Sequence, residues 1–146
     1  MFEVIRSQMG YAKLADGTMI YLRLVITAIK EEARLPVGFN LAMGNQVTIL
    51  AESPPQLKSK IRDKPQPPKQ GEHLKNFDIW DLIDIVETKP ALEEVRYKGS
   101  DNLTYRAAFE IEPTIASRTL EYKDENDNPL YYIRWSEKIS TRIEKT

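Results

Sequence analysis

Two stretches of the chain carry a tyrosine followed two positions later by an arginine. They are DGTMIYLRL, with Tyr21 and Arg23, and DNPLYYIRW, with Tyr132 and Arg134. On a β-strand, residues i and i+2 point to the same face, so each pair would stand side by side. A tyrosine ring can stack on a nucleobase while the neighbouring guanidinium pairs with a phosphate. The spacing therefore suits a surface for single-stranded nucleic acid.

Further cations would add phosphate contacts to such a surface. These are Arg106, Lys58, Lys60, Arg62 and Lys64. Against this hypothesis, tyrosine and arginine are ordinary occupants of exposed strand faces, where the arginine stem covers apolar surface. The net charge is −1, so no global field draws the chain to nucleic acid or to an anionic membrane. Nucleic-acid binding is the alternative hypothesis here, not the leading one.

The two stretches also resemble each other. Each runs from an aspartate and a turn residue into an alternating apolar, Tyr, apolar, Arg, apolar pattern. Turn chemistry alone favours Asp, Asn and Gly at such positions, with alternation beyond them. An internal duplication would give the same likeness, and the residues leave both explanations open.

Most catalytic and metal-dependent chemistry is not indicated. The absence of cysteine excludes disulfides, thiolate nucleophiles and Cys-based zinc sites, and His73 is the only histidine. The acidic turn at 124–128 lacks the pattern of an EF-hand, because Pro129 and Trp135 stand where a glycine and a carboxylate are required. We expect no metal, no cofactor and no catalytic residue, although scattered carboxylates could still converge in space.

The first 51 residues predict two β-hairpins. Residues 2–31 alternate on both sides of Asp16-Gly17, a strong hairpin signal. Residues 37–43 and 46–51 predict a second hairpin, with Gly44-Asn45 as a type II′ turn.

The composition changes between residues 53 and 87. Residues 53–75 are rich in proline and lysine, which predicts an extended arm or loop with no regular element. In residues 77–87, four apolar residues share one helical face, which predicts a short amphipathic helix: Ile79, Leu82, Ile83 and Val86. The β-branched content makes a strand the alternative.

Strands return in the last third of the chain. They are expected at 95–98, 103–112, 115–123 and 130–143. The chain is therefore predicted to be one mainly β domain over residues 1–146, either an antiparallel barrel or a two-sheet sandwich built from hairpins. The 53–75 segment would extend from it.

We expect a non-enzymatic binding or assembly module that mediates protein–protein contacts, with another protein or a second copy as partner. A proline-rich arm starts with little conformational freedom to lose on binding, and its positive charge complements the acidic segment that follows. No signal peptide is recognised, and the longest uncharged apolar run, 24–29, is far shorter than the ~20 residues of a membrane span. The expected location is the cytoplasm, with no membrane contact.

Overall fold

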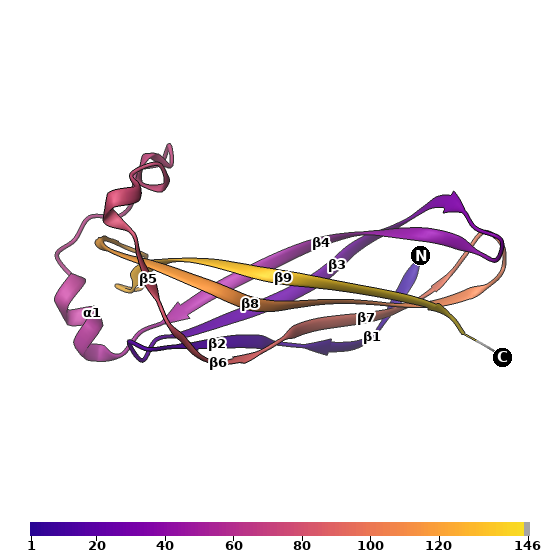
Figure 1. Cartoon of the computed structure of the whole chain (residues 1–146), viewed down its shortest axis with the longest axis horizontal. Helices are drawn as coiled ribbons and strands as arrows, with labels where there is room; N and C mark the ends of the chain where they lie inside the picture. The colour runs from indigo at the N-terminus through magenta and orange to yellow at the C-terminus, as the bar shows by residue number, and fades with distance from the viewer. Residues whose placement is uncertain (145–146) are drawn as a thin grey trace.

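The chain forms an elongated stack of two antiparallel sheets, described here for residues 1–144 of a computed structural model (Figure 1). The predicted single domain runs to residue 146, and its last two residues lie outside the described range. The strands are β1 (Phe2–Gln8), β2 (Gly10–Leu14), β3 (Met19–Arg34), β4 (Phe39–Glu52), β5 (Asp81–Ile83), β6 (Ile85–Lys89), β7 (Ala91–Lys98), β8 (Thr104–Lys123) and β9 (Pro129–Ile143).

Each sheet has its own strand order. In sheet A, β1 pairs with β7 and β7 with β8, while β5 and β9 also pair with β8. Sheet B runs β4-β3-β2-β6. Within residues 1–144 neither sheet closes on itself, so the sandwich prediction is confirmed and the barrel alternative is not realised. Strands β4 and β9 are long edges.

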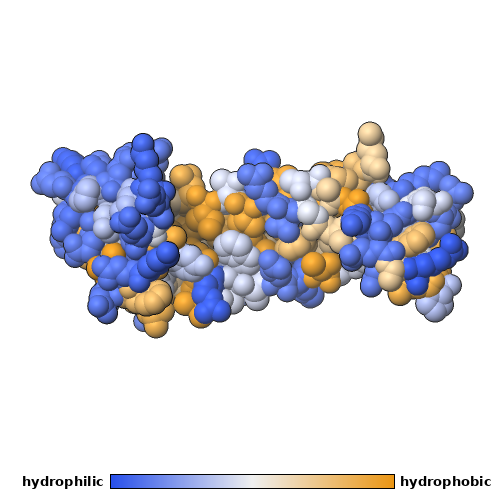
Figure 2. Space-filling model, turned by 90° about the horizontal axis from the view of Figure 1, so that it is seen from above, coloured by the Kyte–Doolittle hydropathy of each residue, from blue (hydrophilic) through white to orange (hydrophobic). Residues whose placement is uncertain are grey.

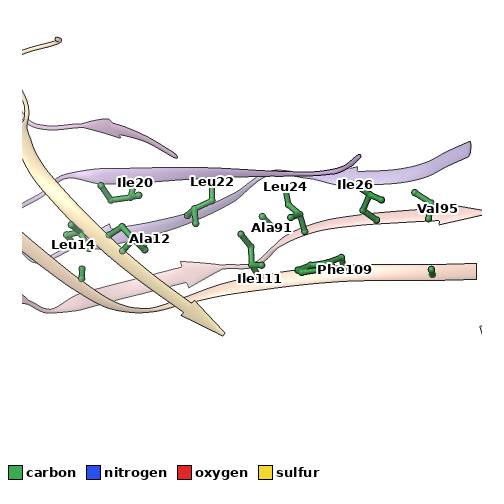
Figure 3. Packing of buried hydrophobic residues seen from close by; sticks show 13 residues of the cluster. Ala12, Leu14, Ile20, Leu22, Leu24, Ile26, Ala91, Val95, Phe109 and Ile111 are labelled. Atoms are coloured by element: carbon green, nitrogen blue, oxygen red, sulfur yellow. The ribbon is translucent and has the colours of Figure 1, made fainter. Parts of the chain in front are cut away.

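The core lies between the sheets. Alternate residues of β3, including Ile20, Leu22 and Leu24, point from sheet B toward Phe109 and Ile111 of β8 (Figure 3). These side chains are at most 2% exposed. Burying each large apolar side chain contributes about 1.5–3 kcal/mol, so this single apolar layer holds the two sheets together.

The chain changes sheets twice at one place. After β1 in sheet A it enters β2 in sheet B at Gly10, and after β6 in sheet B it enters β7 in sheet A at Pro90. The two crossings touch, because a Cβ on Gly10 would lie 2.4 Å from the Ala91 nitrogen. Residues 2–8 therefore do not belong to the first hairpin, which consists of β2 and β3 around Asp16-Gly17.

The predicted turn at Gly44-Asn45 is wrong. Strand β4 runs straight through it and pairs with β3 along its whole length. Gly44 lies opposite a β-bulge, where a Cβ would approach Thr27 Oγ1 to 3.0 Å. The turn is instead at residues 35–38, where Gly38 adopts a φ of +81° and its carbonyl accepts a hydrogen bond from Leu35.

The bulge in β3 is stabilised from sheet A. Strand β2 extends only as far as the residue opposite Leu22, which leaves the Ile26 N–H on that side of β3 without a strand partner. The buried Glu93 of β7 accepts this N–H at 2.7 Å. The buried Glu93 carboxylate is therefore explained by the Ile26 N–H, a backbone donor that has no hydrogen-bond partner within its own sheet.

The predicted helix over 77–87 is also wrong. Only the short 3₁₀ turn Phe77–Ile79 is helical, followed by β5 in sheet A and β6 in sheet B. β-Branched side chains disfavour a helix, and each short strand completes the edge of one sheet. Because residues 77–87 form no acidic helix, the predicted docking of the 53–75 segment on such a helix has no counterpart in the structure.

Residues 53–75, predicted as an extended arm or loop without a regular element, form a loop that contains two short helical elements and does not extend from the domain as an arm. Pro55–Ile61 form α1, with proline in the first turn where its missing N–H costs nothing, and Glu72–Leu74 form a 3₁₀ turn. The segment packs on its own chain: Ile61 is buried, and the Pro65 carbonyl accepts the N–H of Lys123. Five prolines did not prevent a helix because Pro54 precedes it, Pro55 is its first residue and the other three follow it.

The C-terminal prediction is largely confirmed. The predicted turn at 124–128 separates β8 from β9, and a turn at 99–102, between the strands predicted at 95–98 and 103–112, separates β7 from β8. The strands predicted at 103–112 and 115–123 are a single strand, β8, with a register shift at Pro113. A bulge accommodates proline in an interior strand, because the ladder is interrupted there.

Candidate interaction site

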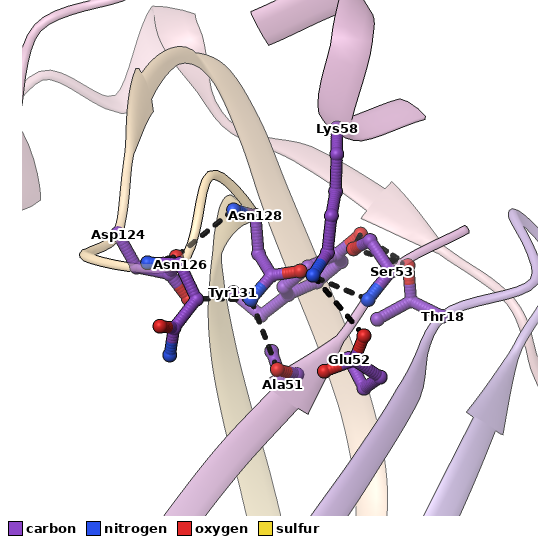
Figure 4. A network of polar contacts seen from close by, with 9 residues as sticks. All are labelled: Thr18, Ala51, Glu52, Ser53, Lys58, Asp124, Asn126, Asn128 and Tyr131. Carbon is purple, nitrogen blue, oxygen red and sulfur yellow. Dashed lines mark hydrogen bonds and ion pairs between the residues drawn. The ribbon is translucent and has the colours of Figure 1, made fainter. Parts of the chain in front are cut away.

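A cluster of polar side chains joins the two sheets at the end of the molecule that carries α1 (Figure 4). The Tyr131 hydroxyl of β9 lies 2.6 Å from Asp16 Oδ2 and 2.7 Å from Thr18 Oγ1, both from the β2–β3 turn. Thr18 Oγ1 also contacts Ser53 Oγ at 2.8 Å, and Arg118 of β8 pairs with Asp16 at 3.0 Å. Every member of the cluster therefore has a partner from the opposite sheet or a neighbouring turn.

The environment shifts two of these groups. Burial of the phenol, with its hydrogen bond to Asp16, raises the pKa of Tyr131 to about 12. Burial alone would raise the pKa of Asp16, but hydrogen bonds from Tyr131, Thr18 and Arg118 outweigh it and lower the pKa. The phenol thus stays protonated and the carboxylate stays charged, which suits a clamp between the sheets.

At the same end of the molecule, a side chain caps the side of β4 that faces away from β3. Buried Asn128, from the β8–β9 turn, accepts the Ser53 N–H and donates to the Ala51 carbonyl, both at 2.9 Å. Its amide therefore imitates a short piece of neighbouring strand. These bonds also show that the backbone groups of odd-numbered residues at this end of β4 point away from β3.

The other end of β4 is terminated in a similar way. The Phe39 N–H donates to the hydroxyl of Tyr105 on β8 at 2.9 Å, and that hydroxyl donates to Asp101 at 2.6 Å. Phe39 is again an odd-numbered residue whose backbone points away from β3. Since backbone groups alternate along a strand, the odd-numbered residues between the two caps point outward too.

This leaves an unpaired stretch in the middle of β4. It comprises Leu41, Met43, Asn45, Val47 and Ile49. Within residues 1–144, β4 pairs only with β3, and the outward N–H and C=O groups of these residues have no hydrogen-bond partner. We call this stretch the free edge.

The free edge carries neither charged residues nor proline. Exposed edges normally carry lysines, other charges or proline, which prevent pairing with another chain. From Phe39 to Ala51 the sequence FNLAMGNQVTILA has no charged residue and no proline. The other long edge, β9, carries Arg134, Glu137 and Lys138. Strand β4 is therefore the edge most suited to receive a strand.

A groove of about 440 Å³, lined by both polar side chains such as Asn40 and Arg142 and apolar ones, adjoins the Phe39 end of the free edge. It opens between the β3–β4 turn and the end of β9, and its walls include Val37, Leu41 and Ile139. Val37 is 67% and Ile139 53% exposed. Figure 2 looks onto the molecule from above Figure 1 and shows hydrophobic side chains exposed along its middle, between two hydrophilic ends.

The predicted Tyr–Arg pairs do not share a surface. Tyr21 and Arg23 lie on the outer face of sheet B, where Tyr21 is opposite Leu50 and Tyr11. Tyr132 and Arg134 lie on β9, with side chains on the outer face of sheet A. The two outer faces point in opposite directions, so a single nucleic acid strand could use only one pair at a time.

Tyr132 belongs instead to a different groove, whose lining is mainly apolar. It lines this groove, of about 400 Å³, with Leu74, Phe77, Trp80 and Ser117. Phe77 is 81% exposed. This groove is on the outer face of sheet A, away from Tyr21.

Several of the other predicted cations are paired with acids. Lys58 lies 3.1 Å from Glu52 and Lys64 3.7 Å from Glu121. Arg106 contacts Glu94 at 3.6 Å and Glu144 at 3.9 Å. The remaining two, Lys60 and Arg62, are exposed in or next to α1. The structure gathers four of these cations around α1 and leaves Arg106 on the outer face of sheet A.

Sequence reasoning missed the residues that define the free edge. Asn128 and Tyr105 cap β4 from more than 60 positions away, and no local pattern reports such contacts. The uncharged run from Phe39 to Ala51 was a usable signal, but the turn assigned to Gly44-Asn45 divided it.

In residues 1–144, no group of three or more His, Asp or Glu side chains is placed to hold a metal ion. In the same range no helix has the length and apolar character needed to cross a bilayer. A scan against protein-family models, a search of curated proteins and a search of solved structures find no match to this chain.

Proposed function

We propose that the chain is a non-enzymatic assembly module whose free edge on β4 receives a β-strand from a protein partner. The observation that carries the proposal is the free edge itself. It has no charge and no proline, and the backbone groups of its five outward-pointing residues, every second residue from Leu41 to Ile49, have no hydrogen-bond partner. Adding a strand would satisfy their N–H and C=O groups, and main-chain bonds of this kind supply the affinity in strand addition.

The neighbouring groove supports the same function. In strand addition, specificity comes from pockets for alternate side chains. The groove beside Leu41 and Val37 would take apolar side chains of the incoming strand and remove exposed hydrophobic surface from water. The sequence predicts residues 53–75 as the contact with a partner. That segment packs against β8 and β9 of its own chain, so we propose β4 as the contact instead.

Nucleic-acid binding is less supported. The two Tyr–Arg pairs lie on opposite faces, and Lys58, Lys64 and Arg106 are engaged with acids. A steep loss of affinity with salt for a single-stranded oligonucleotide, removed by Arg134→Ala, would revive it.

A peptide probe tests strand addition directly. A fluorescent peptide of residues 39–51, carrying a lysine tail for solubility, presents the uncharged alternating part of β4 to the full chain. We expect saturable binding by fluorescence anisotropy and slower amide exchange at Leu41 to Ile49.

The variant Asn45→Pro supplies the specificity control. Proline is tolerated on an edge strand where its missing N–H faces solvent, and Asn45 is such a position. We expect Asn45→Pro to remain folded by circular dichroism yet bind the peptide at least tenfold more weakly. Asn45→Thr keeps the N–H and should bind like the unmodified chain. Equal binding by all three, or none by the unmodified chain, would refute strand addition.

A further inference from the structure

We infer that the strand received by β4 is the β4 of a second copy, paired antiparallel about a two-fold axis at Asn45. This inference rests on the proposed function and names its partner. Three features of the free edge lead to it: the position of its centre, the pattern of its side chains and the location of its charges.

The first feature is the position of the centre. The caps at Phe39 and at Ala51–Ser53 leave five outward-pointing residues, and Asn45 is the third of them. In an antiparallel pair, two directly opposed outward residues exchange two hydrogen bonds. If Asn45 faces Asn45 of the second copy, Met43 faces Val47 and Leu41 faces Ile49. All five residues are then paired, with about ten hydrogen bonds between the copies.

Neighbouring registers do less well. Centring the pair on Gln46 would set Leu41 opposite Ala51, whose carbonyl already accepts the Asn128 amide. Centring it on Gly44 would set Ile49 opposite Phe39, whose N–H already donates to Tyr105. Each shift leaves unpaired groups at both ends. Only the register centred on Asn45 fits between the caps.

The second feature is that the side chains of β4 are symmetric in character about Asn45. On the face toward the core, apolar residues stand two, four and six positions away on both sides of it. They are Phe39, Leu41 and Met43 before it, and Val47, Ile49 and Ala51 after it. In the proposed register each apolar side chain therefore meets an apolar side chain, and the two polar amides meet at the axis.

The third feature is charge. Between Phe39 and Ala51 there is no charge to repel a like charge of the second copy. The single acid of β4, Glu52, comes opposite Gly38 of the second copy. There it lies near Arg34, which is opposite Phe39 on β3. Because Glu52 also holds Lys58, each end of the paired strands gathers one acid and two cations.

The geometry also closes the assembly. A two-fold contact uses the same edge on both copies, so it is saturated by two chains. The remaining long edge, β9, is protected by charges. We therefore expect a defined dimer of twice 16.9 kDa and not an open fibre.

Single-cysteine crosslinking tests the axis, because the chain has no cysteine of its own. Directly opposed residues of a hydrogen-bonded pair have Cα atoms about 5.5 Å apart, which suits a disulfide. We expect Asn45→Cys to form a disulfide-linked dimer on mild oxidation. The matched control Thr48→Cys should not, because the two Thr48 residues would be roughly 20 Å apart.

Light scattering on the unmodified chain and on Asn45→Pro completes the experiment. A dimer for the first, a folded monomer for the second and a crosslink at Asn45 support the inference. A dimer that persists in Asn45→Pro overturns it, because the contact is then elsewhere. A crosslink at Gln46→Cys in place of Asn45→Cys overturns the register. A monomeric chain that still binds the β4 peptide overturns the second copy as partner and leaves strand addition standing. A monomer that does not bind the peptide removes both.

Discussion

The cap at Asn128 allows a quantitative test of how the end of β4 is held. Asn128→Ala removes the acceptor for the Ser53 N–H and the donor to the Ala51 carbonyl. It also removes the amide bond to Asp124 Oδ2. Ser53 is buried and Ala51 half-buried, so water replaces these partners only in part.

The expected cost follows from the two backbone groups. A buried polar group left without a partner costs about 1–3 kcal/mol, and the exposed side of Ala51 reduces its share. We expect Asn128→Ala to lower the free energy of unfolding by about 2–4 kcal/mol, measured by urea denaturation at pH 7. Amide exchange at Ser53 should accelerate, while exchange in β7 should follow only the change in global stability.

A second substitution separates the two backbone bonds. Asn128→Asp can still accept the Ser53 N–H, but it cannot donate to Ala51 and it sets a second carboxylate beside Asp124. It should therefore be destabilising as well, and less so near pH 4, where carboxylates begin to bind protons. If Asn128→Ala unfolds within about 0.5 kcal/mol of the unmodified chain, the cap does not hold β4 and the reasoning on the length of the free edge fails.

Three further predictions concern the clamp, the bulge and the sheet crossing. Because the pKa of Tyr131 rises from 10.0 to about 12 on folding, the unfolded chain loses this proton first, and stability falls as the pH rises between these values. Urea titrations across that range should show a smaller fall for Tyr131→Phe, and an identical fall would contradict the shift. Glu93→Leu leaves the Ile26 N–H unpaired and should cost about 1–3 kcal/mol, whereas Glu93→Gln retains an acceptor and should cost less; equal effects in chemical denaturation would disprove this role. Gly10→Ala sets a methyl group 2.4 Å from the backbone nitrogen of Ala91, so thermal unfolding should show a drop of well over 5 °C, and an unchanged midpoint would mean that the crossings do not touch.

Local chemistry in the sequence was enough to predict several elements. The turn at Asp16-Gly17, the turn at 124–128 and the alternation of β3, β8 and β9 depend on neighbours within a few positions. Such signals report the strands and the mainly β class, because a turn and a two-residue period are properties of a short segment.

Elements whose local preference was ambiguous were decided by their neighbours in space. Gly44-Asn45 has turn chemistry, yet β3 offers a long edge for pairing, and a continuous β4 pairs with thirteen of its residues. Residues 77–87 have helical periodicity, yet β5 and β6 complete two sheet edges. In both cases backbone hydrogen bonds to distant residues outweighed a weak local preference.

The candidate site belongs almost entirely to the tertiary structure. The sequence by itself determined that β4 has no charge to protect it and that the chain lacks cysteine and metal-binding motifs. Only the folded chain decided that β4 is an edge, that Tyr105 and Asn128 limit its free part to five outward residues, and that the two Tyr–Arg pairs face opposite ways. These properties depend on strand order and on register between distant segments, and a one-residue change of register would reverse which groups point outward.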